Sequence, residues 1–388
     1  METGMLINFG AKSLQYKRLL NKKYTTGNQY IIFNYGSDKL IPAISKSLLI
    51  PVQTMKKSYY LFNAGRMSRK DNTLKFTPVD EEGIEGIPKY IPVESVDNLY
   101  AFGSLDANSA LYNFLGKEQI SVHFFDYYEH YTGSFMPKDY LLSGKVLIAQ
   151  TEMYSKLKTR LPLAQKFIEG AAFNMVKNLR YYNNREKDTS VQIERIETLS
   201  TQITGTTDIA MLMGIEGNIR MTYYDAFDQV INDYQMGNRT KQPPNNEVNA
   251  MISFVNMMCY TLCLDMIYHT QLNPTISFLH QPGYRRFSLA LDLAEVFKPI
   301  LADRLIFALL NKKMIGKSDF DYNLNSCLLK DSGRKKVVKA WDEKLNETIK
   351  HRSLGRNVSY KHLVKLECYK LVKHVLGMEV YKPFKAWW

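Results

Sequence analysis

An acidic residue on an apolar helix face is the first feature of this chain that could do chemistry. Apolar residues recur at helical spacing through residues 209–230, and Glu216 falls on that stripe. A lone ionised carboxylate there would be costly unless it were paired or bound to a metal. Gly214 and Gly217 flank it, although a glycine inside a helix costs about 1 kcal/mol relative to alanine, and they indicate close approach by another backbone or a ligand. The alternative is a simple ion pair with Arg220, one helical turn further on.

A second acidic cluster lies in residues 278–299, which read FLHQPGYRRFSLALDLAEVFKP. The helix predicted in this segment is apolar nearly all round and is therefore expected to be buried. It nevertheless carries Asp292 and Glu295, whose spacing places them on neighbouring positions of one face. Two carboxylates close together repel each other, and a divalent cation would remove that cost. His280 stands just before the helix, and an ion pair with a nearby arginine is the alternative for either acid.

Together these side chains would offer carboxylate oxygens and one imidazole nitrogen as ligands. Such mixed ligation suits Mn²⁺ and tolerates Mg²⁺ better than it suits a structural zinc site. A cation of this kind polarises a phosphoryl oxygen and orients the attacking hydroxyl. The pattern is therefore compatible with a metal site that acts on phosphodiesters, beside the ion-pair alternatives.

The charge balance agrees with a polyanionic partner. Lys and Arg total 51 against 38 Asp and Glu, which gives a formal net charge of +13. Basic residues cluster around and after the second acidic segment, where the alternative is an ordinary solvated helix face. The candidate DNA contacts are Arg220, Tyr223, Arg285, Arg286 and Lys298.

The cysteines and the apolar segments bound the cellular setting. We expect the four cysteines to be buried free thiols, which fits a reducing cytoplasm. No secretory signal is visible at the start of the sequence. The longest apolar stretch, residues 252–268, contains Asn256 and Asp265, so it is expected to be a buried core helix and no membrane partner is expected.

Three regions must position these residues. Residues 1–54 are polar, basic and weakly patterned, and we treat them as an extension of unknown nature; a second start at Met55 is plausible. Residues 55–142 contain short aromatic strands and one helix, which predicts a small β-rich domain. Residues 143–388 show helical periodicity, which predicts a larger all-α domain. The expected fold class is α+β.

Three motifs also occur together in order: MGIEGNIRMTYYDAF, PPNNEVNAMISFVNMMCY and FLHQPGYRRFSLALDLAEVFKP. In this arrangement the chain resembles the CRISPR adaptation integrases of the Cas-one family, from about Met55 to Trp388. The resemblance implies that Glu216, His280 and Glu295 hold Mg²⁺ or Mn²⁺, with Asp292 as a supporting acid.

The resemblance also implies partners and a reaction. Residues 55–142 would be the dimerisation domain and residues 143–388 the metal-dependent catalytic domain. A homodimer would join a small Cas-two protein in a hetero-hexameric integration complex. Its substrates would be double-stranded DNA with 3′ ends and the CRISPR repeat DNA. The 3′-hydroxyl of a short foreign DNA would attack a phosphodiester of the repeat array by transesterification, and the same site could cut DNA when water attacks. Two alternatives stay open: a structure-selective metal-dependent nuclease of DNA repair, and a non-catalytic DNA-binding scaffold.

Overall fold

The computed structural model describes residues 56–388 except 127, 139, 140, 142, 284–286 and 325. Before them it describes two strands, β1 (Tyr30–Asn34) and β2 (Ser47–Pro51), which pair antiparallel. The chain divides into two compact units, Met1–Met55 and Lys56–Trp388. The second unit carries every candidate site residue. The DNA contacts predicted at Arg285 and Arg286 lie outside the described residues.

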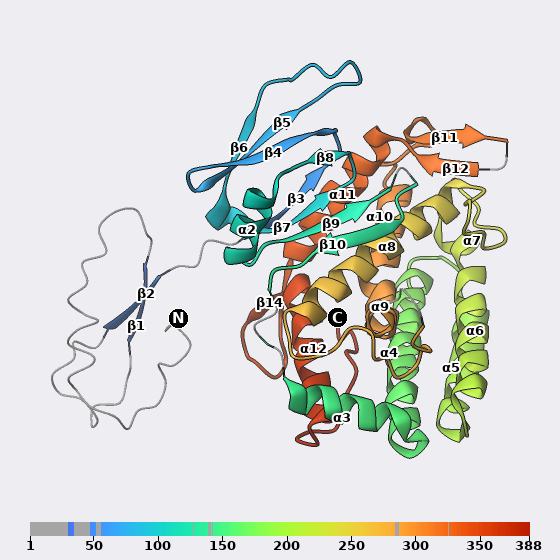
Figure 1. Ribbon diagram of the computed structural model, residues 1–388. Helices are drawn as coiled ribbons and strands as arrows, with labels where there is room; N and C mark the ends of the chain where they lie inside the picture. Colours follow the sequence, from blue (N-terminus) through green and yellow to red (C-terminus); the bar gives the residue numbers. More distant parts are fainter. Residues whose placement is uncertain are drawn as a thin grey trace, which may run out of the picture. The chain divides into compact units, whose positions relative to one another are not determined.

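The β-rich part of the second unit consists of two sheets and one helix (Figure 1). One sheet has the order β10-β9-β7-β3 and is built from β3 (Lys57–Leu61), β7 (Val96–Ala101), β9 (Ser121–Phe125) and β10 (Tyr131–Phe135). The other has the order β6-β5-β4-β8 and is built from β4 (Gly65–Lys70), β5 (Thr73–Pro78), β6 (Lys89–Pro92) and β8 (Leu105–Asp106). The predicted helix is α2 (Ser109–Lys117), and its N-cap Asn108 accepts a hydrogen bond from the Leu111 amide at 3.0 Å.

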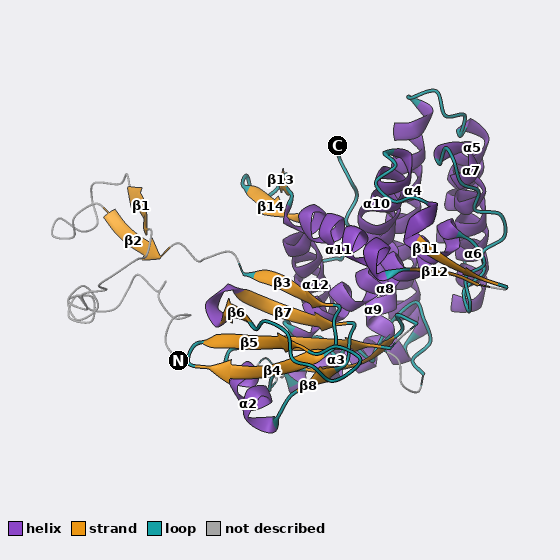
Figure 2. Cartoon of the chain, turned by 90° about the horizontal axis from the view of Figure 1, so that it is seen from above, coloured by secondary structure: helices purple, strands orange, loops and turns teal. Residues whose placement is uncertain are grey.

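Alternation along β7 explains why the first sheet is buried on both faces. Leu99 faces the core between the two sheets, whereas Tyr100 faces the helices. Phe102, just beyond the strand, packs its ring 5.8 Å from that of Phe254 on a central helix. The sheet therefore belongs to two cores at once, and Figure 2 shows the strands grouped beside the helices that they cover.

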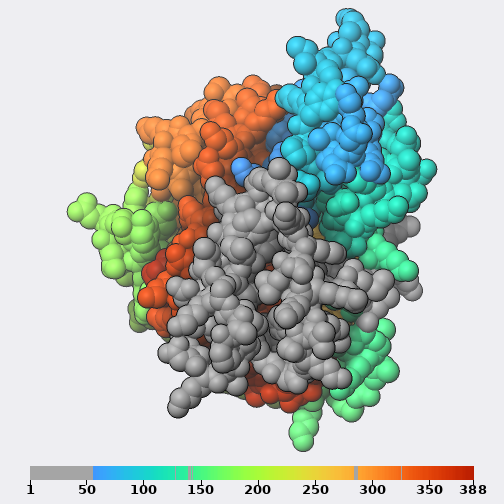
Figure 3. Space-filling view, turned by 90° about the vertical axis from the view of Figure 1, so that its left-hand side faces the viewer, coloured from blue at the N-terminus to red at the C-terminus, as the bar shows by residue number. Residues whose placement is uncertain are grey.

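Helices dominate the rest of the second unit, beginning close to the predicted boundary at residue 143. They are α3 (Gly144–Ser155), α4 (Leu157–Asn183), α5 (Ser190–Thr201), α6 (Ile209–Asp225), α7 (Phe227–Val230), α8 (Glu247–Tyr268), α9 (Ser288–Lys298), α10 (Arg304–Asn311), α11 (Asp331–Asn346) and α12 (Tyr360–Val375). Helix α12 reaches the first sheet through Lys361, which pairs with Asp97 of β7. Figure 3 shows the two parts side by side on one face, blue to teal beside orange to red. The α+β fold class is confirmed.

The central helix α8 is the apolar stretch that the sequence predicted to be a core helix. By length and composition alone it could cross a membrane, but 78% of its most apolar window is buried inside the protein. Asn246 caps its first turn by accepting from the Asn249 amide at 2.8 Å. The four cysteines are free and buried, as predicted, and two of them lie on this helix.

Two short hairpins correct the prediction of an all-α C-terminal region. They are β11 (Phe320–Asn323) with β12 (Ser326–Leu329) and β13 (Thr348–Lys350) with β14 (Asn357–Ser359). Strands of three or four residues are too short to show a clear alternation in sequence. Near the C-terminus, Tyr381 and Phe384 are buried and pack in the core.

Candidate metal centre

Glu216 sits near the middle of α6, whose buried face is made by Leu212, Ile215, Ile219 and Tyr223. Asp208 caps the helix by accepting from the Met211 amide at 2.8 Å. The Glu216 side chain is 15% exposed, so it lies at the edge of the apolar face and not fully inside it. Its carboxylate pairs with Arg220, with 2.7 Å between Oε1 and Nε. The ion pair considered as an alternative from the sequence is therefore present.

The same arginine also contacts the second acidic segment. Arg220 Nη2 donates to Oε2 of Glu295, which comes from α9. The other carboxylate oxygen of Glu295 accepts from Lys298 at 2.8 Å. One guanidinium thus joins Glu216 and Glu295, and this bridge is how the structure brings the two predicted ligands together.

The cluster of two carboxylates and two cations is largely shielded from water. The exposed fractions are 6% for the Glu295 side chain, 20% for Arg220 and 15% for Lys298. Burial opposes the charge of Arg220, but Glu216 and Tyr224 outweigh it and raise the pKa of the guanidinium above its ordinary value. Burial, with a contribution from Arg220, lowers the pKa of Lys298. Both cations contact the carboxylate of Glu295, one at each oxygen.

His280 is held in place by Asp292. Asp292 is fully buried, and its Oδ1 lies 2.9 Å from the Nδ1 atom of His280 and 2.9 Å from the His280 amide. Its Oδ2 accepts from the amides of Phe278 and Leu279 at 2.6 and 2.9 Å. A carboxylate only accepts, so Nδ1 of a neutral His280 carries the hydrogen and the Nε2 lone pair is left for a ligand. Asp292 is a positioning residue.

Two asparagines of α4 position the end of α9 and the turn after it. Asn174 donates to the Val296 carbonyl at 2.9 Å, and Asn178 donates to the Pro299 carbonyl. These carbonyls lie where α9 gives way to the π-helical turn η3 (Pro299–Asp303), in which regular helix hydrogen bonds are interrupted. Both asparagine side chains are fully buried. The sequence reasoning missed them; the available signal was two amide side chains one turn apart, among the apolar residues of the buried face of α4.

Asp303 is a further buried acid that the sequence reasoning missed. It ends the π-helical turn, and the Tyr223 hydroxyl hydrogen-bonds to it. Burial raises its pKa to about 7, against the opposing influence of Arg220 and Lys298. Arg220 and Lys298 therefore also interact electrostatically with the carboxyl group of Asp303.

Among the described residues, Gly214 and Gly217, which flank Glu216 in the sequence, have open space at their Cβ positions. A Cβ atom added to Gly214 or Gly217 would meet no atom within 4 Å. The expectation that another backbone approaches these glycines is therefore wrong, whereas room for a ligand remains. No group of three or more His, Cys, Asp or Glu side chains in the described part of the chain is arranged to hold a metal as it stands. The donor types fit such an ion, but Arg220 and Lys298 occupy the carboxylates.

The described candidates for DNA contact are not equally placed. Tyr223 has no exposed surface and its hydroxyl accepts from Asn178 at 3.0 Å, so its position argues against the predicted contact. Arg220 and Lys298 are engaged with Glu295 and only partly exposed.

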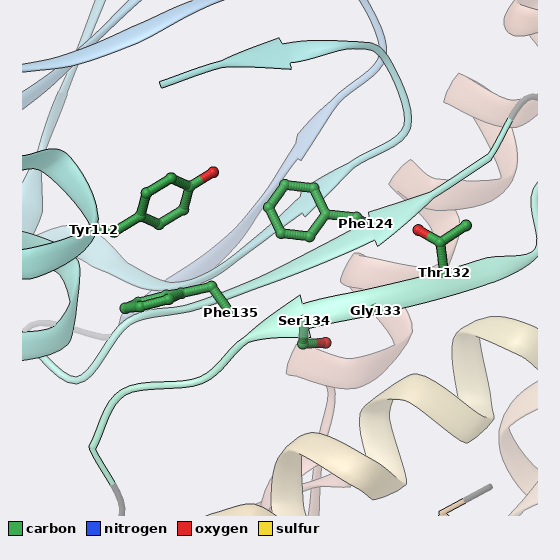
Figure 4. A pocket seen from close by; sticks show the side chains of 6 residues that line it. All are labelled: Tyr112, Phe124, Thr132, Gly133, Ser134 and Phe135. Atoms are coloured by element: carbon green, nitrogen blue, oxygen red, sulfur yellow. The ribbon is translucent and has the colours of Figure 1, made fainter. Parts of the chain in front are cut away.

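Two hollows lie away from this cluster. One, of about 460 Å³, is lined by Tyr112, Phe124 and Phe135 around the β9–β10 edge, and Figure 4 shows these rings with Thr132 and Ser134. The other, of about 530 Å³, lies between the β9–β10 turn and α8. The residues that line them include neither Glu216, His280 nor Glu295.

The family model and the known proteins that this chain resembles in sequence carry the same description. Residues 59–343 match the family described as CRISPR associated protein Cas1. A CRISPR-associated endonuclease Cas1 of Thermodesulfovibrio yellowstonii is 48% identical over 333 residues, which is 86% of this chain and 100% of that protein. A CRISPR-associated endonuclease Cas1 of Fusobacterium nucleatum is 44% identical over 335 residues, 86% of this chain and 98% of its own.

Solved structures show the same similarity. A Cas1 protein from Thermotoga maritima superimposes with a TM-score of 0.75 at 36% identity, covering 84% of this chain and 99% of its own. A casposase bound to integration product gives a TM-score of 0.75 at 20% identity, covering 85% and 93%. A Cas6-RT-Cas1–Cas2 complex gives 0.71 at 17% identity, covering 86% of this chain and 37% of that chain. At these low identities the last two show a shared fold.

Proposed function

Because the chain belongs to the CRISPR associated protein Cas1 family, we propose that it is a metal-dependent DNA integrase and endonuclease of CRISPR adaptation. The observation that carries this proposal is that the carboxylates of Glu216 on α6 and Glu295 on α9 both pair with the guanidinium of Arg220. Buried carboxylates gathered in this way form a site for positive charge. His280, whose ring is fixed by Asp292, is a nitrogen donor of the right type for such a site.

Glu216, Glu295 and the Nε2 atom of His280 would hold Mg²⁺ or Mn²⁺. When bound, the ion would polarise the phosphodiester and stabilise the charge that develops on it. Asp292 keeps the His280 ring oriented through its 2.9 Å contact with Nδ1.

The proposed reaction is transesterification. The 3′-hydroxyl of a short double-stranded DNA attacks the phosphorus of a phosphodiester in the CRISPR repeat and forms a new P–O bond. The bond from this phosphorus to the 3′ oxygen of the repeat strand breaks, and that oxygen takes up a proton and leaves as a 3′-hydroxyl. Water in place of the donor hydroxyl gives cleavage. The similarity to a casposase bound to integration product supports DNA as the substrate.

We further propose a homodimer that assembles with a Cas2-type protein into a hetero-hexamer in the cytoplasm. The similarity to a chain of a Cas6-RT-Cas1–Cas2 complex supports the partner. The net charge of +13 supports a DNA-bound assembly.

A joining assay tests the function. The protein, its Cas2-type partner and a short duplex are mixed with a plasmid that contains the repeat, in Mn²⁺, Mg²⁺ or a chelator. We expect metal-dependent joining that disappears when the donor lacks its 3′-hydroxyl. Glu216→Ala, His280→Ala and Glu295→Ala should each abolish joining, and Arg180→Ala, which removes a surface ion pair with Glu197, should not.

The outcomes separate the alternatives. Strong cutting of branched DNA without any joining would favour a repair nuclease. Salt-sensitive DNA binding that is indifferent to chelator and to Glu216→Ala would favour a non-catalytic scaffold. Full joining by any one of the three alanine variants would overturn the role proposed for that residue.

A further inference from the structure

Arg220 occupies the position between the two proposed carboxylate ligands. Its Nε lies 2.7 Å from Oε1 of Glu216, and its Nη2 donates to Oε2 of Glu295. The guanidinium is planar, so these contacts use two nitrogens of one rigid group to span α6 and α9. Arg220 is therefore the group that holds the two acidic side chains together.

A divalent cation bound by both carboxylates would need the same place. Its ligand oxygens would lie roughly 2.0–2.2 Å from its centre, which leaves no room for guanidinium nitrogens between them. The positive charges of Arg220 and of the ion would also repel each other at close range in a shielded cluster. Metal and guanidinium cannot neutralise the same carboxylate oxygens at one time.

Lys298 is a second cationic group at the Glu295 carboxylate. Its Nζ lies 2.8 Å from Oε1 of Glu295, so both oxygens of that carboxylate accept from cationic groups. Glu216 keeps one oxygen outside its contact with Arg220. A metal ion would thus meet Glu216 first and would then have to displace cations from Glu295.

The surroundings provide places for the displaced group. Tyr224, one turn beyond Arg220 on α6, hydrogen-bonds to the guanidinium. Asp303 interacts electrostatically with Arg220. The open space at Gly217 lies on the same helix, one turn before the arginine. The Arg220 side chain is also 20% exposed, so it borders solvent on one side.

We propose that Arg220 is a resident counter-ion that a divalent cation must displace from Glu216 and Glu295. It stabilises the metal-free protein by neutralising the two acids, and it weakens metal binding by the same contacts. This inference rests on the metal site of the proposed function and concerns how that site is regulated.

The test measures metal binding without DNA and without turnover. Full-length wild-type protein and Arg220→Met are stripped with a chelator and then dialysed. Mn²⁺ binding is followed by calorimetry and by the paramagnetic resonance signal of free Mn²⁺. Methionine keeps an unbranched side chain but removes the charge. We expect Arg220→Met to bind Mn²⁺ at least tenfold more tightly, with a lower Tm in chelator and a larger rise in Tm on adding Mn²⁺.

Two further variants complete the design. Arg180→Met removes an exposed arginine that pairs with Glu197, and it should leave Mn²⁺ affinity unchanged. Arg220→Gln keeps a hydrogen-bond donor, and it should also bind Mn²⁺ more tightly. If Arg220→Met does not fold in chelator, the proposal requires Mn²⁺ to restore cooperative unfolding, because the ion replaces the missing counter-ion.

Equal or weaker Mn²⁺ binding by a folded Arg220→Met or Arg220→Gln would overturn the proposal. Failure of Mn²⁺ to restore an unfolded Arg220→Met, with no tightening in Arg220→Gln, would also overturn it. Failure of the proposed function looks different: neither wild type nor the variants would then bind Mn²⁺, or Glu216→Ala would not weaken the binding. A wild type that binds only weakly beside an Arg220→Met that binds well would support the inference.

Discussion

Nδ1 of His280 lies 2.9 Å from Oδ1 of Asp292, and the same carboxylate accepts the backbone amide of His280. One buried acid therefore fixes both the ring and the backbone of the histidine. Its other oxygen accepts from two further amides of the loop before α9. The loop and the helix are joined through this single side chain, which makes its replacement informative.

Asp292→Asn should weaken metal binding and DNA joining by roughly 10–100-fold without abolishing them. His280 stays as a ligand, but its ring loses the carboxylate that orients it. The substitution should also lower the free energy of unfolding by about 2–4 kcal/mol, because hydrogen bonds to a buried charge are lost. Calorimetry with Mn²⁺ and urea unfolding measure the two effects. The matched control is Asp126→Asn, whose carboxylate lies 3.3 Å from His130 at the surface. Equal effects of the two substitutions would contradict the role given to Asp292.

Glu295→Gln should destabilise the metal-free protein more than Glu216→Gln. Glu295 neutralises Arg220 and Lys298 and is almost fully buried, so its loss leaves cations uncompensated and should cost about 3–5 kcal/mol. Among the described residues the Glu216 carboxylate pairs with Arg220, which would keep Glu295 as a partner, so about 1–3 kcal/mol is expected. Urea midpoints in chelator, compared at constant m, give the order. The reverse order would contradict the arrangement of the cluster.

The sequence was sufficient to predict the helix faces on which Glu216 and Glu295 lie, because helical spacing alone places both residues on largely apolar surfaces. It also suggested the ion pair between Glu216 and Arg220, since both lie on one helix. It could not show that Arg220 also reaches Glu295. That contact joins two helices far apart in the chain, and spacing within one helix does not reveal contacts between helices.

The sequence also left the directions of Asp292 and Glu295 undecided. Their spacing suggested neighbouring positions, yet Asp292 turns to the loop amides and Glu295 turns to the cations of the cluster. Side-chain direction depends on partners supplied by other segments, such as the amide of Phe278. Asn174 could not be singled out for the same reason, because the carbonyls to which it donates belong to Val296 and Phe384, far away in the sequence.

Asp265→Ala should uncouple the β-rich part from α8. Asn98 of β7 donates to Oδ2 of this buried acid at 2.9 Å, and His123 of β9 lies 3.7 Å from Oδ1. Burial opposes ionisation, but His123 and His269 outweigh it and hold the pKa of Asp265 below its ordinary value. We expect a loss of about 3–5 kcal/mol.

A double-mutant cycle with His123→Ala should give a coupling of roughly 0.5–3 kcal/mol, as for groups in one network. The surface control is Asp233→Ala, whose pair with Lys313 is exposed and should contribute no more than about 1 kcal/mol. Additive effects of Asp265→Ala and His123→Ala would show that the two residues do not act together.

Asp303 gives a prediction about pH. Burial raises its pKa from 3.8 to about 7, so the folded protein holds this proton more tightly than the unfolded chain does. The stability that Asp303 contributes is therefore complete below pH 3.8 and is lost as the pH rises through 7. Asp303→Asn removes this dependence. Relative to wild type, the variant should gain up to roughly 4 kcal/mol in unfolding free energy between about pH 4 and pH 8.

Chelated protein unfolded in urea across this range provides the measurement, and Asp319→Asn provides a control of opposite sign. Burial opposes ionisation of Asp319, but Lys336 and the Gly316 amide outweigh it and lower its pKa. Its contribution is therefore present above its ordinary pKa and is lost as the pH falls. Asp319→Asn should consequently lose more stability at neutral pH than in acid. A flat difference between Asp303→Asn and wild type would mean that Arg220 and Lys298 keep Asp303 ionised throughout, with its negative charge a permanent part of the cluster.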